Sequence, residues 1–389
     1  MERLYFDHNA TTPVLPEVLE AMQPFYMGVY GNPSSIHHFG QQARAGVEQA
    51  RVEVARLLNC RPNEIVFTSG GTEAANLAVF GAVRAAVPRG SDPKHVITSD
   101  IEHHAVLNAC EALEKEGVEV TYVPAGRDGV VDPNDVRRAL RPETVLITVM
   151  YANNEIGTIQ PVAEIAALAR AHGVLMHTDA VQAAGKIPVD VKALGVDLLS
   201  ISGHKIYAPK GVGALFARRN TLLKPLSYGG HHERDRRAGT ENVVGIVGLG
   251  RAAELARRSL AEEGRCLAAL RDRLERGILE RVDEAGVNGD RTRRVPNTTN
   301  VHFDYVEGEA LVIALDLKGV ACSTGAACSS GAIEPSHVLT AIGLRPDQAR
   351  ASLRFSLGRQ NTPEQVDQVL QVLPGVVSHL RELSPAYKK

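Results

Sequence analysis

The sequence predicts an α/β protein with a large domain built on a mainly parallel sheet and a smaller α+β domain. Two observations support this prediction. Short apolar runs rich in β-branched residues alternate with longer helical patterns up to residue 217, and this alternation is typical of a parallel sheet covered by helices on both faces. A long helical pattern then separates these runs from a second, smaller group of strands and helices.

The short apolar runs are expected to be the strands of the large sheet. They are NEIVFTS (63–69), KHVITSD (94–100), VEVTYVP (118–124), TVLITVMYA (144–152), GVLMHTDA (173–180), DLLSIS (197–202) and GVGALFA (211–217). A helix is expected to begin near Glu73, directly after the first run. Residues 251–282 carry leucine and isoleucine near helical spacing, so we expect one or two long amphipathic helices that connect the domains. In the smaller domain, 297–306 and 349–358 are strand-like and 308–319 is helical.

Composition excludes several classes of partner. The 389 residues suffice for two domains, or for one large domain with a satellite. A formal net charge of −2, with both signs mixed along the chain, provides no patch for nucleic acid or an anionic membrane. No apolar stretch approaches the roughly 18 to 20 residues of a membrane span. Five scattered cysteines do not form a disulfide framework, so we expect reduced thiols and a cytoplasmic protein.

The residues that follow each strand are the first place to look for a ligand, because ligands bind beyond the carboxyl ends of parallel strands. After the first strand comes SGGTEAAN (69–76), a glycine turn that opens a helix. The free N–H groups of such a helix end, with the hydroxyl of Thr72, suit one phosphate, although this motif alone slightly favours an ordinary helix cap, because glycine turns before helices are common. Neither GxxxxGK[ST] nor GxGxxG is present, and GIVGLG (245–250) lacks a strong strand before it.

Polar side chains also follow the other strands. Glu102, His103 and His104 come after one strand, Asn153, Asn154 and Glu155 after another, and Asp179 and Gln182 after a third. A single residue of this kind is more often a loop hydrogen-bonder than a catalytic group, but several together are a candidate site. The paired histidines lack the spacing of known zinc sites, so no intrinsic metal is expected.

The segment DLLSISGHKIYAPKGVGAL (197–215) is the most informative. Its strand delivers Ser202, Gly203, His204 and Lys205 at its end. A lysine in apolar surroundings favours its neutral amine and is then a Schiff-base candidate. A lysine for the aldehyde, N–H donors for the phosphate and an aspartate for the ring nitrogen are what pyridoxal phosphate (PLP) requires, and Asp179 fits the last role.

A run of small residues, CSTGAACSSG (322–331), carries two cysteines and little that would pack a core. Cys328 is expected to be exposed on a pliable loop, which suits either a nucleophile or an inert surface thiol. The cysteines at 60, 110 and 266 fall in helical patterns and are expected to pack.

Over essentially its whole length the chain resembles the cysteine desulfurases of the NifS/IscS type, within the fold-type I, class V aminotransferase-like PLP enzymes. The resemblance rests on YFDHNATTP (5–13), GNPSS (31–35), SGGTEAAN (69–76), EHHAV (102–106), MYANNEIG (150–157), HTDAVQ (177–182), SGHKIYAPKG (202–211), AGTEN (238–242), the cysteine loop and RFSLGR (354–359). It implies a PLP-binding large domain at 15–259, and a small domain at 1–14 and 260–389 that carries the loop at about 321–332.

The resemblance also implies roles for individual residues. Lys205 would hold the PLP aldehyde and move a proton, His104 would stack on the ring and assist proton transfer as a catalytic residue, and Asp179 would pair with the ring nitrogen. Gln182 and Asn154 would lie near the phenolic oxygen of the cofactor, and its phosphate would be bound by Gly71, Thr72, Ser202 and His204. Thr240 would reach the phosphate of the partner subunit, so the functional unit would be a homodimer. Arg354 would bind the carboxylate of the substrate, with Asn154 beside it.

By the same resemblance, the Cys328 thiolate would take sulfur from L-cysteine, release alanine and keep a persulfide for an iron–sulfur scaffold or another acceptor protein. Through that persulfide it would also be a ligand of a transient iron–sulfur cluster. The loop departs from the family pattern at Ala326, where serine is frequent, and at Cys322, an extra thiol read as a bystander, with a resolving role left open.

Two alternatives remain open at this stage. Another PLP enzyme of the same fold, such as a selenocysteine lyase or an aminotransferase, would keep Lys205 and Asp179 without depending on Cys328. A non-catalytic sulfur-relay scaffold would use the loop without PLP. The sequence does not separate iron–sulfur assembly, tRNA thiolation and thiocofactor synthesis as destinations of the sulfur.

Overall fold

The computed structural model describes residues 3–87, 93–325, 335–385 and 387. Its main sheet has seven strands in the order β2-β8-β7-β6-β5-β3-β4. They are β2 (Ile65–Thr68), β3 (His95–Ser99), β4 (Glu119–Val123), β5 (Thr144–Thr148), β6 (Leu175–Asp179), β7 (Leu198–Ser202) and β8 (Gly213–Ala217). Strands β3 to β7 are parallel to one another, whereas β8 is antiparallel to both of its neighbours, β2 and β7. The seven predicted strands and the mainly parallel sheet are therefore confirmed.

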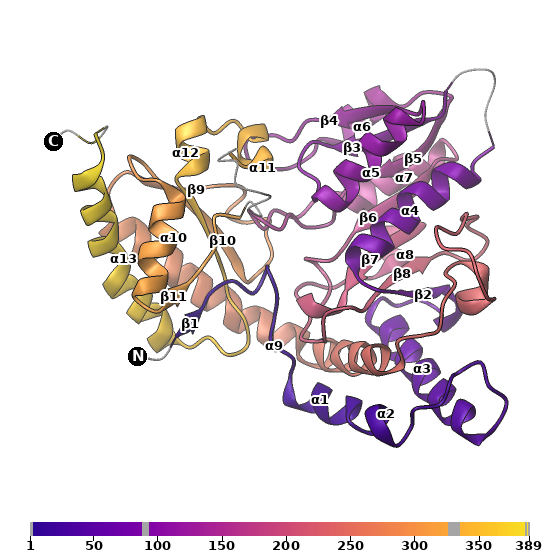
Figure 1. Cartoon of the computed structure of the whole chain (residues 1–389). Coiled ribbons are helices and arrows are strands. Elements are labelled where there is room, and N and C mark those ends of the chain that lie inside the picture. Colours follow the sequence, from indigo (N-terminus) through magenta and orange to yellow (C-terminus); the bar gives the residue numbers. More distant parts are fainter. Residues whose placement is uncertain (1–2, 88–92, 326–334, 386, 388–389) are drawn as a thin grey trace.

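Both faces of this sheet are buried under helices (Figure 1). Successive strand residues point to opposite faces, so Val66 packs in one apolar cluster while Ile65 and Phe67 pack in another. One face is covered by α4 (Gly71–Ala85) and α5 (His104–Lys115). The other carries α1 (Pro16–Met22), α3 (His38–Leu57), α7 (Val162–Ala171) and part of α9. Shorter helices are α2 (Pro24–Met27), α6 (Pro133–Ala139) and α8 (Val191–Leu194).

Helix α9 (Val243–Arg281) is a single helix of 39 residues that runs from the large sheet to the smaller part of the molecule (Figure 1). The long helix predicted for 251–282 is thus confirmed and begins earlier, at the Asn242 cap, whose side chain accepts the N–H of Gly245. Glycines in GIVGLG let α9 approach its neighbours, since a Cβ on Gly250 would lie 2.5 Å from Cα of Ala50. This stretch is a helix-packing surface rather than a nucleotide loop.

The smaller part combines strands and helices, as predicted. An antiparallel sheet has the order β12-β10-β9, and β1 pairs with β11 in a separate parallel ribbon. The strands are β1 (Leu4–Tyr5), β9 (Ala285–Val287), β10 (Thr298–Phe303), β11 (Val320–Ala321) and β12 (Ser352–Ser356), and the helices are α10 (Gly308–Leu317), α11 (His337–Ala341), α12 (Pro346–Arg350) and α13 (Pro363–Leu383).

A second core supports the proposed domain division without fixing its limits. This cluster contains Leu4, Phe6 and residues from Leu267 onward, all within 1–14 and 260–389. The core of the large sheet, however, also takes in Val295, Val338 and other residues of the C-terminal segment. The boundaries at residues 14 and 259 therefore remain a prediction.

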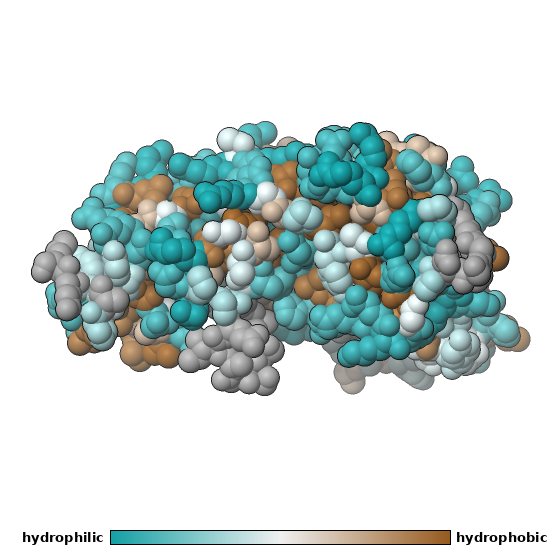
Figure 2. All heavy atoms as spheres, turned by 90° about the horizontal axis from the view of Figure 1, so that it is seen from above, coloured by the Kyte–Doolittle hydropathy of each residue, from teal (hydrophilic) through white to brown (hydrophobic). Residues whose placement is uncertain are grey.

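Seen from above, hydrophilic residues cover most of the molecule, and hydrophobic residues show between them over both parts (Figure 2). Among the described residues, none of the helices combines the length and the apolar character needed to cross a membrane.

Candidate active site

A cavity of about 570 Å³ opens at the carboxyl ends of the central strands. Segments that follow β2, β3, β5, β6 and β7 contribute to its wall, together with the N-terminal segment and the smaller part of the chain. Its lining includes Asn9, Ala10, Gly71, Thr72, Glu73, His103, Asn154, Asp179, Gln182, Ser202, His204, Lys205, Lys210, Ser323, Gly325 and Arg354. The structure thus brings together most of the predicted site residues, which come from distant parts of the sequence.

The N-terminus of α4 forms one end of this cavity. Gly71 packs so closely that a Cβ would lie 2.8 Å from Cγ2 of Val181, whereas a Cβ on Gly70 would meet nothing within 4 Å. The first N–H groups of a helix have no partner inside it, so those of α4 face open space beside Thr72 and Ser202. This arrangement suits an anion.

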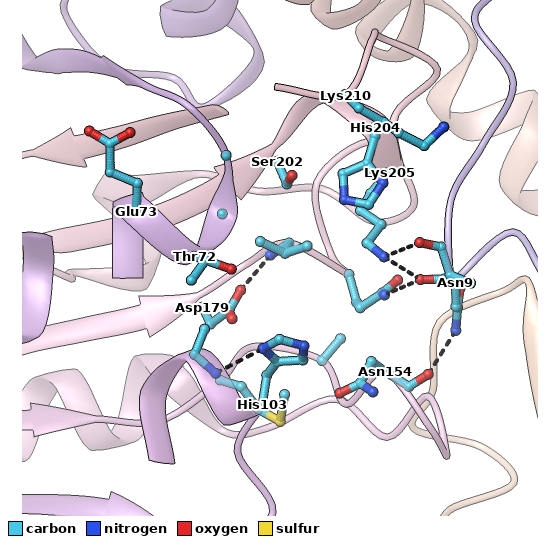
Figure 3. Close-up of a pocket in the computed structure, with 18 of the residues that line it drawn as sticks. Asn9, Thr72, Glu73, His103, Asn154, Asp179, Ser202, His204, Lys205 and Lys210 are labelled. Atoms are coloured by element: carbon cyan, nitrogen blue, oxygen red, sulfur yellow. Dashed lines mark hydrogen bonds between the residues drawn. The ribbon is translucent and has the colours of Figure 1, made fainter. Parts of the chain in front are cut away.

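Lys205 ends a short 3-10 turn (Gly203–Lys205) that directly follows β7. Its Nζ donates to the carbonyl oxygens of Asn9 and Ala10, at 2.6 Å each (Figure 3). Burial and the nearby positive charge of Arg354 lower the pKa of Lys205 to about 8, although Asp7 and Asp179 act in the opposite direction. A substantial fraction of this amine is therefore neutral near pH 8.

Asp179 ends β6 and points into the same space as Lys205 (Figure 3). The side chain is 6% exposed, and its Oδ1 accepts the N–H of Val181 at 2.9 Å. Burial raises the pKa of Asp179 to about 6, which the hydrogen bond and Lys205 only partly oppose. A cationic partner in the cavity would restore the charged carboxylate.

The histidine assignment has to be corrected. His103, not His104, lines the cavity and is labelled in Figure 3; it caps α5, and its Nδ1 accepts the N–H of Ala105. His104 begins the helix and instead places its ring 4.9 Å from that of His337. Neighbouring residues at a helix start point in different directions, so a shift of one residue moves the side chain out of the site.

His103 is suited to lie against an aromatic ring without carrying charge. Its side chain is exposed in the open cavity. Desolvation by the surrounding protein is the main cause that lowers the pKa of His103 to about 4, and the positive charge of Lys205 acts in the same direction. The imidazole is therefore neutral near pH 7.

Arg354 is a buried side chain, 4% exposed, in the centre of β12. Its Nη2 forms an ion pair with Oδ1 of Asp7 at 2.7 Å, and its Nη1 donates to the carbonyl oxygen of Asn154 at 3.0 Å. Its Nε is buried with no partner among the described residues. The guanidinium is thus held in a fixed position on the cavity wall, ready for an anionic ligand.

Asn9 is the main residue that the sequence reasoning missed. Its carbonyl accepts from Lys205 and from Nε2 of Gln182, and its side chain donates to the carbonyl of Asn154 and to Thr298. The YFDHNATTP motif drew attention to this segment only because it contributes to the family resemblance. Contacts that span 196 residues, as between Asn9 and Lys205, leave no local pattern in the sequence.

Thr240 does not line the cavity of its own chain. It lies in a smaller adjacent cavity of about 90 Å³, together with Ser69 and Gly211, which also line the main one. This position is compatible with the predicted contact to a partner subunit and does not test it.

The cysteines divide into different environments. Cys328 lies outside the described residues. Cys322 is buried in the second core, and burial raises its pKa to about 12, so it is a packing residue rather than part of an exposed loop. Cys110 is buried as predicted, and Cys60 is half-buried. The expectation for Cys266 is wrong, because this residue is exposed on α9.

Within residues 3–87, 93–325, 335–385 and 387, no group of three or more histidine, cysteine, aspartate or glutamate side chains could hold a metal ion.

Comparison with known proteins identifies the family. Residues 4–369 match the family model described as "Aminotransferase class-V". The chain is 50% identical over 386 residues to "Cysteine desulfurase IscS" of Dictyoglomus turgidum, an alignment that covers 99% of this chain and 97% of the relative. It is 51% identical over 386 residues to "Cysteine desulfurase IscS" of Methanosarcina thermophila, with 99% and 95% covered.

Solved structures show the same kinship. A "NIFS-LIKE PROTEIN" superposes with a TM-score of 0.91 at 38% identity and covers 97% of this chain and 100% of its own. A structure described as "SspA in complex with cysteine" superposes with a TM-score of 0.81 at 39% identity, with 91% and 98% covered. The chain therefore belongs to the aminotransferase class-V family and, within it, to the cysteine desulfurases.

Proposed function

We propose that this protein is a cysteine desulfurase that uses pyridoxal phosphate to convert L-cysteine to L-alanine and leaves a persulfide on Cys328. The observation that carries the proposal is the placement of Lys205 and Asp179 in one cavity, beside the N-terminus of α4. The names of the relatives support the same activity.

The residues present fit this cofactor. The backbone at Gly71, with Thr72, Ser202 and His204, would hold its phosphate. Asp179 would pair with the ring nitrogen, a cation that would relieve the cost of its buried charge. Lys205 would bind the aldehyde, His103 would lie against the ring, and Gln182 would donate its amide to the phenolic oxygen, because Lys186 already donates to Oε1 of Gln182.

When bound, pyridoxal phosphate supplies an electron sink for the bonds at the substrate carbons. Arg354 binds the substrate carboxylate, and Asn154 lies beside it. Lys205, with a pKa of about 8, both accepts and donates a proton near neutral pH, so it moves the proton at the substrate Cα.

In the sulfur step, the Cys328 thiolate attacks the sulfur of the bound substrate cysteine. An S–S bond forms, the C–S bond breaks, and its electron pair stays with the substrate carbon, which takes up a proton and leaves as alanine. The thiolate of a free cysteine is a minor species at pH 7, so the site has to assist its formation. The persulfide sulfur then passes to an acceptor protein, either an iron–sulfur scaffold or another thiolation partner. The enzyme would act as a cytoplasmic homodimer.

The first test compares the wild type with Cys328→Ala for release of alanine and sulfide from L-cysteine in the presence of a reductant. We expect the variant to keep the absorbance of bound cofactor and to lose sulfide release, because the nucleophile is separate from the cofactor site. An unchanged turnover would replace this proposal with a lyase or an aminotransferase. A colourless wild type would favour a sulfur-relay scaffold.

A further inference from the structure

Two described residues flank the segment that carries Cys328, namely Gly325 before it and Ser336 after it. Both lie against one buried side chain, Glu155, which is 3% exposed. The hydroxyl of Ser336 donates to Oε2 of Glu155 at 2.6 Å. On the other side, a Cβ added to Gly325 would lie 3.1 Å from the same Oε2, so the glycine backbone packs directly on the carboxylate.

The backbone of Glu155 is itself held firmly. Oδ1 of Asn153 accepts its N–H at 2.8 Å, and Nδ2 of Asn300 donates to its carbonyl at 3.2 Å. Glu155 therefore connects the loop after β5 to β10 of the second sheet. Because its backbone is anchored to both parts of the molecule, Glu155 presents its side chain from a fixed position.

Each flanking residue has further contacts that agree with this role. Before the segment, Ser323 exchanges backbone hydrogen bonds with Arg354, and its Oγ accepts the N–H of Gly325 at 3.0 Å. Gly325 has φ +91°, a conformation that side chains rarely adopt. Both observations favour a single backbone path up to Gly325.

After the segment, Oγ of Ser336 caps α11 by accepting the N–H of Leu339 at 3.2 Å. The ring Nε2 of the next residue, His337, lies 2.9 Å from the carbonyl oxygen of Glu102 and donates to it. Its ring also meets His104 edge to face. The Ser336 hydroxyl therefore makes two hydrogen bonds: its oxygen accepts the N–H of Leu339, and its hydrogen is donated to Glu155.

We propose that Glu155 is a positioning residue for sulfur transfer: its carboxylate fixes Gly325 and Ser336, the two ends from which the segment with Cys328 departs. This rests on the proposed function. Glu155 does not line the cavity, so it acts on the reaction through these two residues. It governs the attack of the Cys328 thiolate on the substrate sulfur, while cofactor and substrate bind as before.

The chemical test is single-turnover persulfide formation on Cys328 in the cofactor-loaded enzyme, followed by mass spectrometry. We expect Glu155→Ala to slow this step about 10- to 100-fold, since small displacements of reacting groups have effects of this order. Glu155→Gln keeps an acceptor oxygen for Ser336 and should recover most of the rate. Ser336→Ala should slow the step in the same way, and the double variant Glu155→Ala/Ser336→Ala should be no slower than the slower single variant.

Thr299→Val is the matched control. Thr299 also donates its hydroxyl to a buried glutamate, Glu275, at 2.8 Å, but neither residue touches Gly325 or Ser336. This variant should lose stability and keep the rate of persulfide formation. The absorbance and affinity of bound cofactor should stay at the wild-type level in all the variants.

Hydrogen exchange of the apoprotein provides a readout that needs no turnover. Amides of residues 323–325 and 336–341, on either side of the segment, should exchange faster in Glu155→Ala than in the wild type, and those in α9 should not. The proposal is overturned if persulfide forms at the wild-type rate in Glu155→Ala, if Thr299→Val is equally slow, or if exchange is unchanged. A wild type that forms no persulfide would refute the proposed function, and the exchange experiment would then decide the role of Glu155 alone.

Discussion

Lys205 and Asp179 owe their chemistry to burial more than to each other. Burial is the first cause of both shifts, lowering the pKa of the lysine to about 8 and raising that of the carboxyl to about 6. Their mutual attraction opposes both shifts, so the cavity keeps two groups near the point of titration around neutral pH. A ligand that brings an anionic phosphate and a cationic ring nitrogen would resolve this tension.

The raised pKa of Asp179 leads to a prediction about the apoprotein. A carboxyl whose folded pKa lies above its unfolded value favours the folded state at low pH, and this contribution is lost as the pH rises through the folded pKa. A rise in the pKa of Asp179 from 3.8 to about 6 lowers the free energy of unfolding above pH 6 by up to about 3 kcal/mol. Apo Asp179→Asn should therefore be more stable than the wild type at pH 7.5 by up to this amount.

Urea unfolding of both apoproteins at pH 4 and pH 7.5 measures this difference, which should nearly vanish at the lower pH. In the loaded enzyme the same change should reduce turnover, because asparagine cannot balance the charge of a ring nitrogen. A stability gain that is equal at both pH values would contradict the argument.

Arg354 leads to a prediction about substrate affinity. Arg354→Lys keeps the charge but loses the planar fork that matches a carboxylate. A charge-assisted hydrogen bond contributes about 1.5 to 3 kcal/mol, so KM for L-cysteine should rise roughly 10- to 100-fold with a smaller change in kcat. Arg273→Lys, in an exposed ion pair with Asp367, serves as the control and should leave both constants unchanged. A fall in kcat alone would show that Arg354 does not bind the substrate.

For single residues, the sequence predicted which types of side chain form the site better than which positions provide them. Lys205 and Asp179 were found because each lies at or just after the end of a strand, where the sheet must face the ligand. His103 was mistaken for His104 because the EHHAV motif contains two adjacent histidines, and the resemblance alone did not show which of them faces the cavity. Asn9 was missed because its contacts depend on tertiary structure alone.

Among the elements, the seven strands of the large sheet were predictable because each is a compact apolar run with β-branched residues. The reversed direction of β8 was not predicted. It follows β7 after ten residues, and so short a connection favours an antiparallel neighbour, since a parallel one needs a crossover of a dozen or more. The sequence left open whether this region forms one long helix, α9, or two, because the spacing of apolar residues alone does not show where a helix is interrupted.

Two glycines of α9 allow a matched test of helix packing. A Cβ on Gly250 would lie within 2.6 Å of Cα and Cβ of Ala50, so Gly250→Ala should destabilise the protein by about 1 to 3 kcal/mol. On Gly264 a Cβ would meet nothing closer than 3.9 Å, so Gly264→Ala should stabilise it by about 0.5 to 1 kcal/mol. Urea unfolding measures both, and a loss at Gly264 would show that glycine is needed there for another reason.

At the scale of the whole molecule, the predicted homodimer can be tested through Thr240. Loss of a hydrogen bond to a phosphate should weaken cofactor binding in Thr240→Ala about 10- to 100-fold. A mixed dimer of one Lys205→Ala chain and one Thr240→Ala chain would have one complete site only if Thr240 serves the partner subunit. We therefore expect one site of wild-type affinity per mixed dimer, measured by titration with the cofactor. The absence of any such site would place Thr240 in its own chain's site.

The N-terminal segment has a consequence for how the enzyme is made. Leu4 pairs with Val320, and the amide of Asn9 bonds to Ser356, 347 residues further along. During synthesis these partners are made several hundred residues after the N-terminal segment, so the segment cannot reach its place until they have emerged from the ribosome. The large sheet can form during translation, but the backbone acceptors of Lys205 reach their place only after residues 320–356 are available. The cofactor site is therefore completed only after the segment up to Ser356 has left the ribosome.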